Sequence, residues 1–221
     1  MLRAALNSVI SPIRRYGLIA RFAGDLRAIR ADLIVVVVAI GIVSRLLLPG
    51  FALSQESEEG LINREYPLKA LFIYNFASYI EWPQSAFADS QSPFVIGVLG
   101  TSLIDDTLNQ ISASKQIAGR KIVVSHFVSV SDIKPCQILF IPHSLPPAQQ
   151  RQAIEALKNL PVLIVGESDG FAALGGDVNF FVQANRIRFE INLTVMKQQD
   201  LKASSKLLAM AKIVESAPVQ R

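Results

Sequence analysis

The sequence predicts an α/β domain in which a mostly parallel sheet carries helices on both faces and an antiparallel hairpin follows near the C-terminus. Two observations indicate this fold class. Short apolar runs recur along residues 94–165 without polar alternation, and segments with helical spacing separate them, which is typical of parallel strands buried on both faces. After Gly175-Gly176 the pattern changes. Arg186 to Ile191 alternates between charged and apolar residues, as a strand with one exposed face does.

The first expected element is a helix that begins at Glu65 and ends before Pro83. Pro67 falls in its expected first turn, where the missing N–H costs nothing. The helix also carries apolar residues such as Tyr74 on its other face, so it should be buried on two sides or covered by a partner. The stripe with helical spacing consists of Leu68, Leu71, Phe72, Phe76 and Tyr79, and the other face of Ile73, Tyr74 and Ala77.

The remaining elements follow in a regular order. The hairpin begins after the glycine pair, and two helices are expected to close the chain, the second capped by Ser204. Its expected buried stripe is Leu207, Leu208, Ala211 and Val214. The expected strands are 94–99, 122–128, 137–141, 162–165, 178–182 and 186–191, and the expected helices are 104–111, 147–160, 193–199 and 204–215.

Residues 1–54 are expected to be a signal peptide. An uncharged run, Leu33 to Val43, follows several arginines, and the small residues Ala52 and Ser54 stand at positions −3 and −1 of a cleavage site before Gln55. The alternative is a single membrane anchor over residues 33–53, in which the charge of Arg45 costs a few kcal/mol. Both alternatives place the following domain across the membrane. Residues 55–64 are expected to form a polar, acidic linker, and residues 65–215 the α/β domain.

The formal charge of +4 misleads about the domain itself. Seven arginines against two aspartates give residues 1–54 a charge of +5, which leaves −1 for residues 55–221. The electrostatic footprint of a nucleic-acid-binding protein is therefore missing. Cys136 is the only cysteine, so no disulfide within one chain is possible, and its place in an apolar run predicts a buried, unreactive thiol.

The segment Gly166 to Gly170 has the G-x-S-x-G pattern of a hydrolase nucleophile elbow after an apolar strand. The hydrolases with this elbow need a histidine later in the chain, but His126 and His143 both precede Ser168. A turn built from Gly, Ser and Asp explains the pattern better. The sequence therefore predicts no catalytic residues.

Cofactor and metal sites are not predicted either. His126 is expected at a strand end and His143 in an exposed loop, and neither has a cysteine pair nearby with the spacing of zinc ligands. Residues 97–102 connect an expected strand to a helix, whose N-terminus can hold an anion, but the G-x-G-x-x-G fingerprint is missing. An ordinary strand-to-helix turn is the favoured interpretation.

Arg186, Arg188 and Glu190 share one face of the last expected strand. One interpretation is a solvated face with weak local ion pairs, which also discourages unwanted strand pairing. The other is a recognition surface for a partner.

Several segments together resemble YfiR-like periplasmic proteins. The segment Leu68 to Ala77 (LKALFIYNFA), followed by Glu81-Trp82-Pro83, is similar to the opening helix of that family. Asn185 to Asn192 (NRIRFEIN) is similar to its last strand. The resemblance covers roughly Glu65 to Glu215. Further similar segments come in the family's order at 119–120, 136–141, 161–166, 175–176 and 201–208.

The resemblance implies a Rossmann-like α/β sandwich without catalytic residues or cofactor. It also implies a periplasmic regulator that binds the sensor domain of a membrane diguanylate cyclase, holds it inactive and so controls cyclic-di-GMP. Family members with paired cysteines can be tuned by redox state, whereas this chain has Cys136 alone. The alternative function is a periplasmic small-ligand-binding protein linked to transport or to a histidine kinase.

We expect the protein to act by binding, as a homodimer that also meets a membrane-bound signalling protein through that protein's periplasmic domain. Two surfaces are candidates: the first helix with its Glu-Trp end, whose excess apolar surface needs a cover, and the charged face of the last strand. The alternative is that both are internal packing. The predicted partner-binding residues are Tyr74, Glu81, Trp82, Arg186, Arg188 and Glu190.

Overall fold

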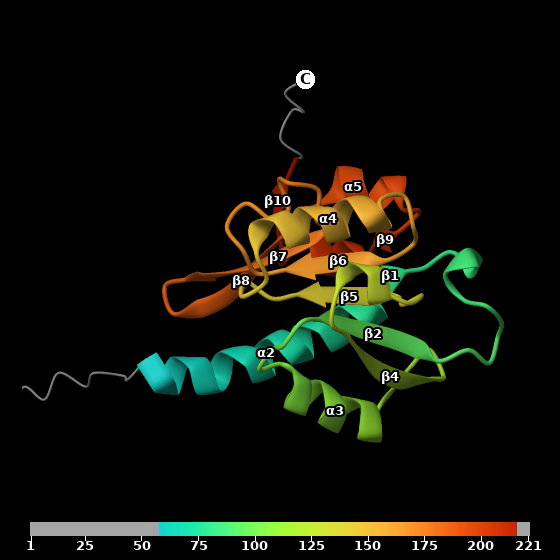
Figure 1. Cartoon of the computed structure of the whole chain (residues 1–221), viewed down its shortest axis with the longest axis horizontal. Coiled ribbons are helices and arrows are strands. Elements are labelled where there is room, and N and C mark those ends of the chain that lie inside the picture. Colours follow the sequence, from blue (N-terminus) through green and yellow to red (C-terminus); the bar gives the residue numbers. More distant parts are fainter. Residues whose placement is uncertain (1–57, 216–221) are drawn as a thin grey trace, which may run out of the picture. The chain divides into compact units, whose positions relative to one another are not determined.

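An eight-stranded sheet forms the centre of residues 58–215, the part of the chain that the computed structural model describes (Figure 1). The strand order is β10-β8-β7-β6-β5-β2-β4-β3, and a separate two-stranded sheet pairs β1 with β9. The strands are β1 (Ile80–Glu81), β2 (Phe94–Leu99), β3 (Gln116–Ile117), β4 (Arg120–Phe127), β5 (Ile138–Ile141), β6 (Leu163–Gly166), β7 (Val178–Gln183), β8 (Arg186–Asn192), β9 (Lys202–Ala203) and β10 (Lys212–Val214).

The centre of the sheet is parallel. β2 lies between β4 and β5, and β6 and β7 continue the parallel pairing beyond β5. β7 and β8 form an antiparallel hairpin, in which Phe180 stands opposite Phe189. Ala184 and Asn185 at its tip both have positive φ, as a tight hairpin turn requires. The helices are α2 (Glu58–Tyr79), α3 (Asp105–Ser114), α4 (Pro147–Leu157), α5 (Leu193–Gln198) and α6 (Ser205–Leu208).

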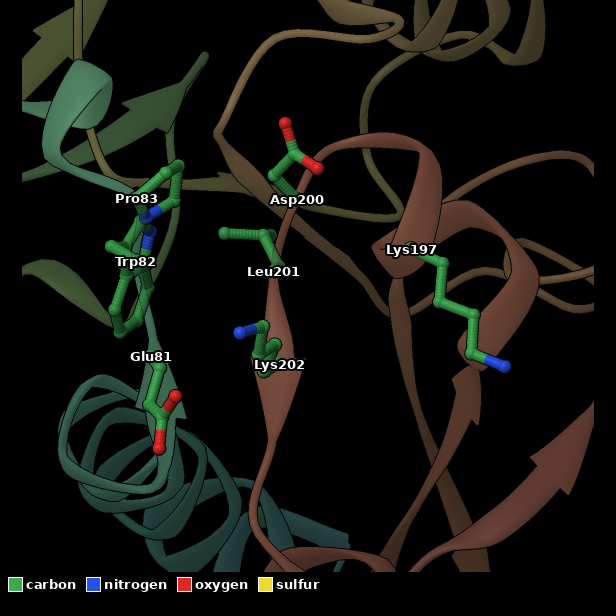
Figure 2. A pocket seen from close by; sticks show the side chains of 7 residues that line it. All are labelled: Glu81, Trp82, Pro83, Lys197, Asp200, Leu201 and Lys202. Atoms are coloured by element: carbon green, nitrogen blue, oxygen red, sulfur yellow. The ribbon is translucent and has the colours of Figure 1, made fainter.

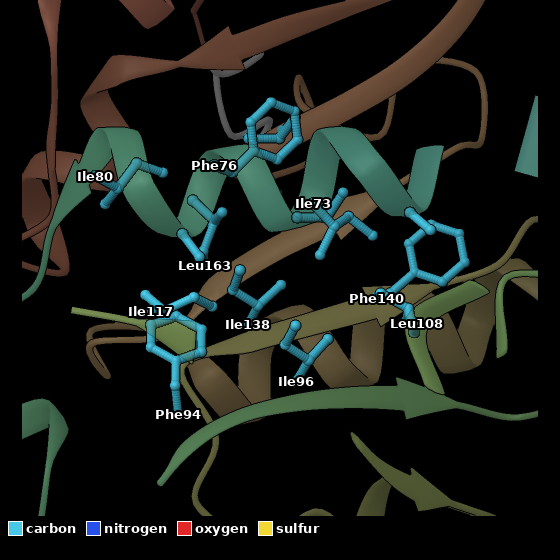
Figure 3. Packing of buried hydrophobic residues seen from close by; sticks show 14 of the residues in the cluster. Ile73, Phe76, Ile80, Phe94, Ile96, Leu108, Ile117, Ile138, Phe140 and Leu163 are labelled. Carbon is cyan, nitrogen blue, oxygen red and sulfur yellow. The ribbon is translucent and has the colours of Figure 1, made fainter. Parts of the chain in front are cut away.

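Helices cover both faces of the sheet. On one face α2 and α3 pack over a large apolar cluster, in which Ile73, Phe76 and Ile80 of α2 point toward the strands (Figure 3). The ring of Phe76 meets those of Phe180 and Phe189 there, with centroids 5.7 and 5.0 Å away. On the other face α4 packs over a second cluster of Leu99, Phe127, Leu139, Ile141, Ile164 and Phe171. The predicted fold class, a mostly parallel sheet with a C-terminal hairpin and helices on both faces, is therefore confirmed.

Helix α2 differs from its prediction at both ends and in the residues that it buries. It ends at Tyr79 rather than at Trp82, because Ile80–Glu81 forms β1 and pairs with β9. It begins at Glu58 rather than at Glu65, so Pro67 lies inside the helix. Leu68 and Leu71 of the stripe with helical spacing are exposed, whereas Ile73 and Ala77 of the other face are buried. Periodicity alone cannot choose between two apolar faces of one helix, and in the structure the face with Ala70, Ile73, Phe76 and Ala77 packs on the sheet.

The end of the chain is not the long helix expected over residues 204–215. Ser204 does cap a helix, because its hydroxyl accepts the N–H of Leu207, but α6 ends at Leu208. The chain then extends into β10, which pairs in parallel with β8. The backbone edge of β8 offers hydrogen bonds to residues 212–214. The free energy of these hydrogen bonds outweighs the preference for a helix that the spacing of apolar residues indicated. The hairpin therefore lies one strand inside the edge of the sheet.

A buried carboxyl group joins β6, β7 and α5. The side chain of Asp177 has no exposed surface and accepts the N–H of Ile164 at 2.7 Å. The Gln199 amide, with its nitrogen turned inward, donates to Asp177 Oδ1 and to the Val162 carbonyl oxygen, both at 2.9 Å. Burial raises the pKa of Asp177 well above its usual value, although the hydrogen bonds from Ile164 and Gln199 act in the opposite direction.

The expected leader, residues 1–54, lies outside the described residues, as do residues 55–57 of the expected linker. The other linker residues, from Glu58 on, belong to α2. Within residues 58–215 no helix combines the length and apolar character needed to cross a membrane.

Candidate functional site

Helix α2 shows a narrow strip of its surface to solvent. From Arg64 to Tyr79, the exposed residues are spaced four, three, four and three positions apart, and all the remaining residues are half-buried or buried. We call the exposed residues the α2 ridge: Arg64, Leu68, Leu71, Asn75 and Ser78. Leu68 and Leu71 at its centre are each 46% exposed. Tyr74, one of the predicted partner-binding residues, is half-buried beside the ridge and packs against the core.

Trp82 follows α2 at the amino end of β2. Its ring meets the ring of Phe94 edge-on at 5.1 Å, and its Nε1 is buried without a hydrogen-bond partner among the described residues. The same side chain lines a cavity of about 390 Å³ beside β1 and β9 (Figure 2). Glu81 is exposed there, and the other lining residues are Pro83, Lys197, Asp200, Leu201 and Lys202. Trp82 therefore combines packing on the core with a place at the cavity wall.

The hairpin carries the two predicted arginines, and their exposure to solvent differs from that of Glu190. Arg186 and Arg188 are exposed, and neither guanidinium has a hydrogen bond or ion pair with the residues that the structure describes. Glu190 is buried, accepts the Asn179 amide at 3.3 Å and pairs with Lys212 of β10 at 3.3 Å. The interpretation of these three residues as one solvated face is wrong for Glu190, whose side chain is buried against Asn179 of β7 and Lys212 of β10.

The predicted residues do not form one site. Trp82 contacts Phe94, which opens β2 at the amino ends of the parallel strands. Arg186 stands opposite Gln183, the last residue of β7, at the carboxyl ends. The sheet therefore separates the Glu81-Trp82 region from the arginines by the length of its strands.

A buried charge cluster, not predicted from the sequence, ties α2 to the carboxyl ends of β5 and β6. Lys69 Nζ lies 2.5 Å from Glu167 Oε2 and 2.5 Å from Glu65 Oε1. The side chains of Lys69 and Glu167 are only 5% and 1% exposed. Burial lowers the pKa of Lys69, but the hydrogen bond and charge of Glu167, together with Glu65, outweigh this and leave that pKa raised. Lys69 also lies 4.9 Å from the centre of the Tyr66 ring.

The other Glu167 oxygen faces His143. Glu167 Oε1 accepts the backbone N–H of His143 at 3.0 Å and lies 2.9 Å from its Nδ1. The predicted exposed position of His143 is confirmed, since its side chain is 63% exposed. The only signal in the sequence was a lysine within the apolar stretch of the helix, with a glutamate four residues before it. Its buried partner is 98 residues away, beyond the reach of local spacing.

The segment Gly166 to Gly170 is a turn at the end of β6, as predicted. Phe171 N donates to the Ser168 carbonyl oxygen at 3.0 Å, and both histidines lie beside other carboxylates, with His126 Nε2 3.1 Å from Asp105 Oδ1 and His143 Nδ1 2.9 Å from Glu167 Oε1. Among the described residues no cluster of three or more His, Cys, Asp or Glu side chains has the arrangement of a metal site. Cys136 is buried as predicted, and burial raises the pKa of its thiol to about 12.

A sequence model of the YfiR/HmsC-like family matches residues 66–212, about two thirds of the chain. The chain belongs to this family. Its members are regulatory proteins of the periplasm, so family membership supports a periplasmic regulatory role for this protein. The matched region includes α2 from Tyr66 on, the Lys69–Glu167 pair, Trp82 and the hairpin arginines.

A solved structure is also similar, the crystal structure of a conserved domain protein from Vibrio cholerae O1 biovar El Tor. It shares 11% identity with this chain at a TM-score of 0.45, over 67% of this chain and 60% of that one. No curated protein matches the sequence.

Proposed function

We propose that this YfiR/HmsC-like protein is a non-catalytic periplasmic regulator that binds the periplasmic domain of a membrane-bound diguanylate cyclase and thereby lowers cyclic-di-GMP synthesis. The contact is made by the hairpin end of the sheet, through Arg186 and Arg188, to an acidic surface of the partner. Glu81, Trp82 and Tyr74 lie elsewhere and are not part of this contact. Glu190 acts indirectly, because it holds Lys212 and β10 beside the arginines.

The observation that carries the proposal is a pair of exposed guanidinium groups without carboxylate partners in the described chain. Arg188 stands opposite Phe181 in the hairpin, and the Phe181 ring lies 5.8 Å from Lys212 Nζ, so basic and aromatic residues share this end of the sheet. Val182 at the same end of the hairpin is exposed. Arginines beside aromatic and apolar surface are typical of protein interfaces, and unpaired charges of one sign favour a partner of the opposite sign.

Charge reversal tests this surface. In the double variant Arg186→Glu, Arg188→Glu, capture of the cyclase from solubilised membranes should fall at least about tenfold, and cellular cyclic-di-GMP should rise. The thermal unfolding temperature should stay unchanged, since neither side chain holds the fold. Arg151→Glu, on the exposed face of α4, is the matched control with the same kind of charge change. Unchanged capture by the double variant, or equal loss by the control, would contradict the proposal.

A second candidate function, small-ligand binding, is favoured by the cavity beside Trp82. Two lysines and two carboxylates line it together with the indole ring, which suits a small polar molecule with an aromatic or apolar part (Figure 2). Trp82 is the only tryptophan, so the tryptophan emission of the protein reports on the surroundings of this one side chain. A saturable change in emission on titration with a periplasmic ultrafiltrate would support ligand binding. A flat titration would speak against it.

A further inference from the structure

The α2 ridge has the pattern of a helix–helix seam. Its exposed positions alternate between spacings of four and three residues, which is the spacing of the a and d positions of a heptad. Leu68 and Leu71 occupy the centre, and polar residues occupy both ends. Half-buried aromatic side chains, Phe72 and Tyr74, flank the leucines.

Between Arg64 and Tyr79, the other faces of α2 pack against this chain. Ile73, Phe76 and Ile80 face the sheet, and α3 and α6 pack at its sides. From Arg64 to Tyr79, Leu68 and Leu71 are therefore left on a strip of exposed residues, while the rest of this part of the helix is half-buried or buried. Scattered exposed leucines are ordinary on protein surfaces, but two adjacent ones on a heptad seam are what a second helix buries.

We propose that the α2 ridge is the interface of a two-fold symmetric homodimer in which the α2 helices of two copies pack antiparallel. The sequence did not say which of the two candidate surfaces a second copy contacts. This assignment does not depend on the identity of the membrane partner.

The order of residues along the ridge selects a second copy and the antiparallel direction. In antiparallel packing a positions face d positions, so Leu68 meets Leu71 of the other copy and Arg64 meets its Asn75. The guanidinium of Arg64 can then donate to the Asn75 carbonyl oxygen. In a parallel pair, Arg64 would face Arg64 of the other copy, which is unfavourable. The ridge is thus complementary to itself under a two-fold axis between the leucines, as an isologous interface requires.

Disulfide cross-linking in the envelope tests the direction. Two differently tagged full-length copies, one with Leu68→Cys and one with Leu71→Cys, are expressed together and oxidised. The mixed pair should cross-link several-fold more than either variant does with itself. The buried native thiol, Cys136, should not interfere. Leu174→Cys, an exposed leucine in the loop before β7, measures random collision.

A change of charge provides a second, independent test of the antiparallel interface. Asn75→Asp creates an opposite-charge pair with Arg64 of an antiparallel copy, so sedimentation at low salt should show an association constant about two- to fivefold higher. Leu71→Asp should make the protein monomeric at the same concentration. Weaker association of Asn75→Asp, or preferential cross-linking of each cysteine variant with itself, would overturn the antiparallel assignment. Cross-linking no stronger than that of Leu174→Cys, or only to a different protein, would overturn the dimer interface itself.

Discussion

At the scale of single residues, Asp177 is a buried acid whose protonation is coupled to folding. The folded protein holds the proton at pH values where the unfolded chain, with an ordinary aspartate pKa near 3.9, has released it. The folded state then binds more protons, so the contribution of this residue to the free energy of unfolding falls as pH rises above about 4. The fall is at most about 1.4 kcal/mol per pH unit.

Asp177→Asn should remove this pH dependence. Asparagine keeps an acceptor for Ile164 N, and its amide can donate to Gln199 once that side chain rotates. Urea unfolding between pH 5 and pH 8 should therefore show a smaller loss of stability for the variant than for the natural protein. Asp89→Asn is the control, because hydrogen bonds from Gln91 and Ser92 lower the pKa of Asp89, and its effect is confined to acid pH. Equal slopes for Asp177→Asn and the natural protein would refute the coupling.

Lys69 should be a strong stability determinant. Lys69→Met leaves the buried Glu167 without its cation and should lower the free energy of unfolding by about 3–5 kcal/mol. The double variant Lys69→Met, Glu167→Gln should recover much of that loss, which urea unfolding would show. Glu65→Gln is the matched control, because this more exposed carboxylate should contribute about 1 kcal/mol or less. A double variant as unstable as Lys69→Met alone would mean that the pair is not the cause.

At the scale of elements, β10 is the strand at the edge of the sheet, beside β8, although a helix was predicted for its residues. Ending the chain after Ala211 removes β10 and the Lys212 partner of Glu190. The free energy of unfolding should fall by roughly 1–3 kcal/mol from lost ladder hydrogen bonds and the unpaired buried charge. The exposed edge of β8 should also promote aggregation, measurable by light scattering. A chain ending after Glu215 keeps β10 and serves as the control, and if it behaved like the shorter one, the effect could not come from β10.

At the scale of the whole molecule, the expected export signal decides where the domain works. The protein recovered from the periplasm should begin at Gln55, because Ala52 and Ser54 fit a cleavage site. N-terminal sequencing of the soluble envelope fraction checks this. A product retained in the membrane and beginning before Leu33 would favour the anchor, and the regulator would then be tethered beside its partner.

The sequence by itself determined the fold class and most of its elements. β2 matches its predicted bounds, and the other expected strands agree with the structure to within about two residues. Continuous apolar runs report burial on both faces, and alternation reports the hairpin, because both patterns reflect the local environment of each strand. The buried Cys136, the cap at Ser204 and the exposed loop position of His143 follow from equally local signals.

Tertiary structure alone decided what depends on residues far apart in the chain. It chose which apolar face of α2 meets the sheet and left Leu68 and Leu71 exposed, and it turned residues 212–214 from an expected helix into a strand. It buried Glu190 away from Arg186 and Arg188, and it joined Lys69 to Glu167. In each case the free energy that decides the structure comes from contact with a strand or a charged residue far away in the sequence. Local periodicity carries no information about such contacts.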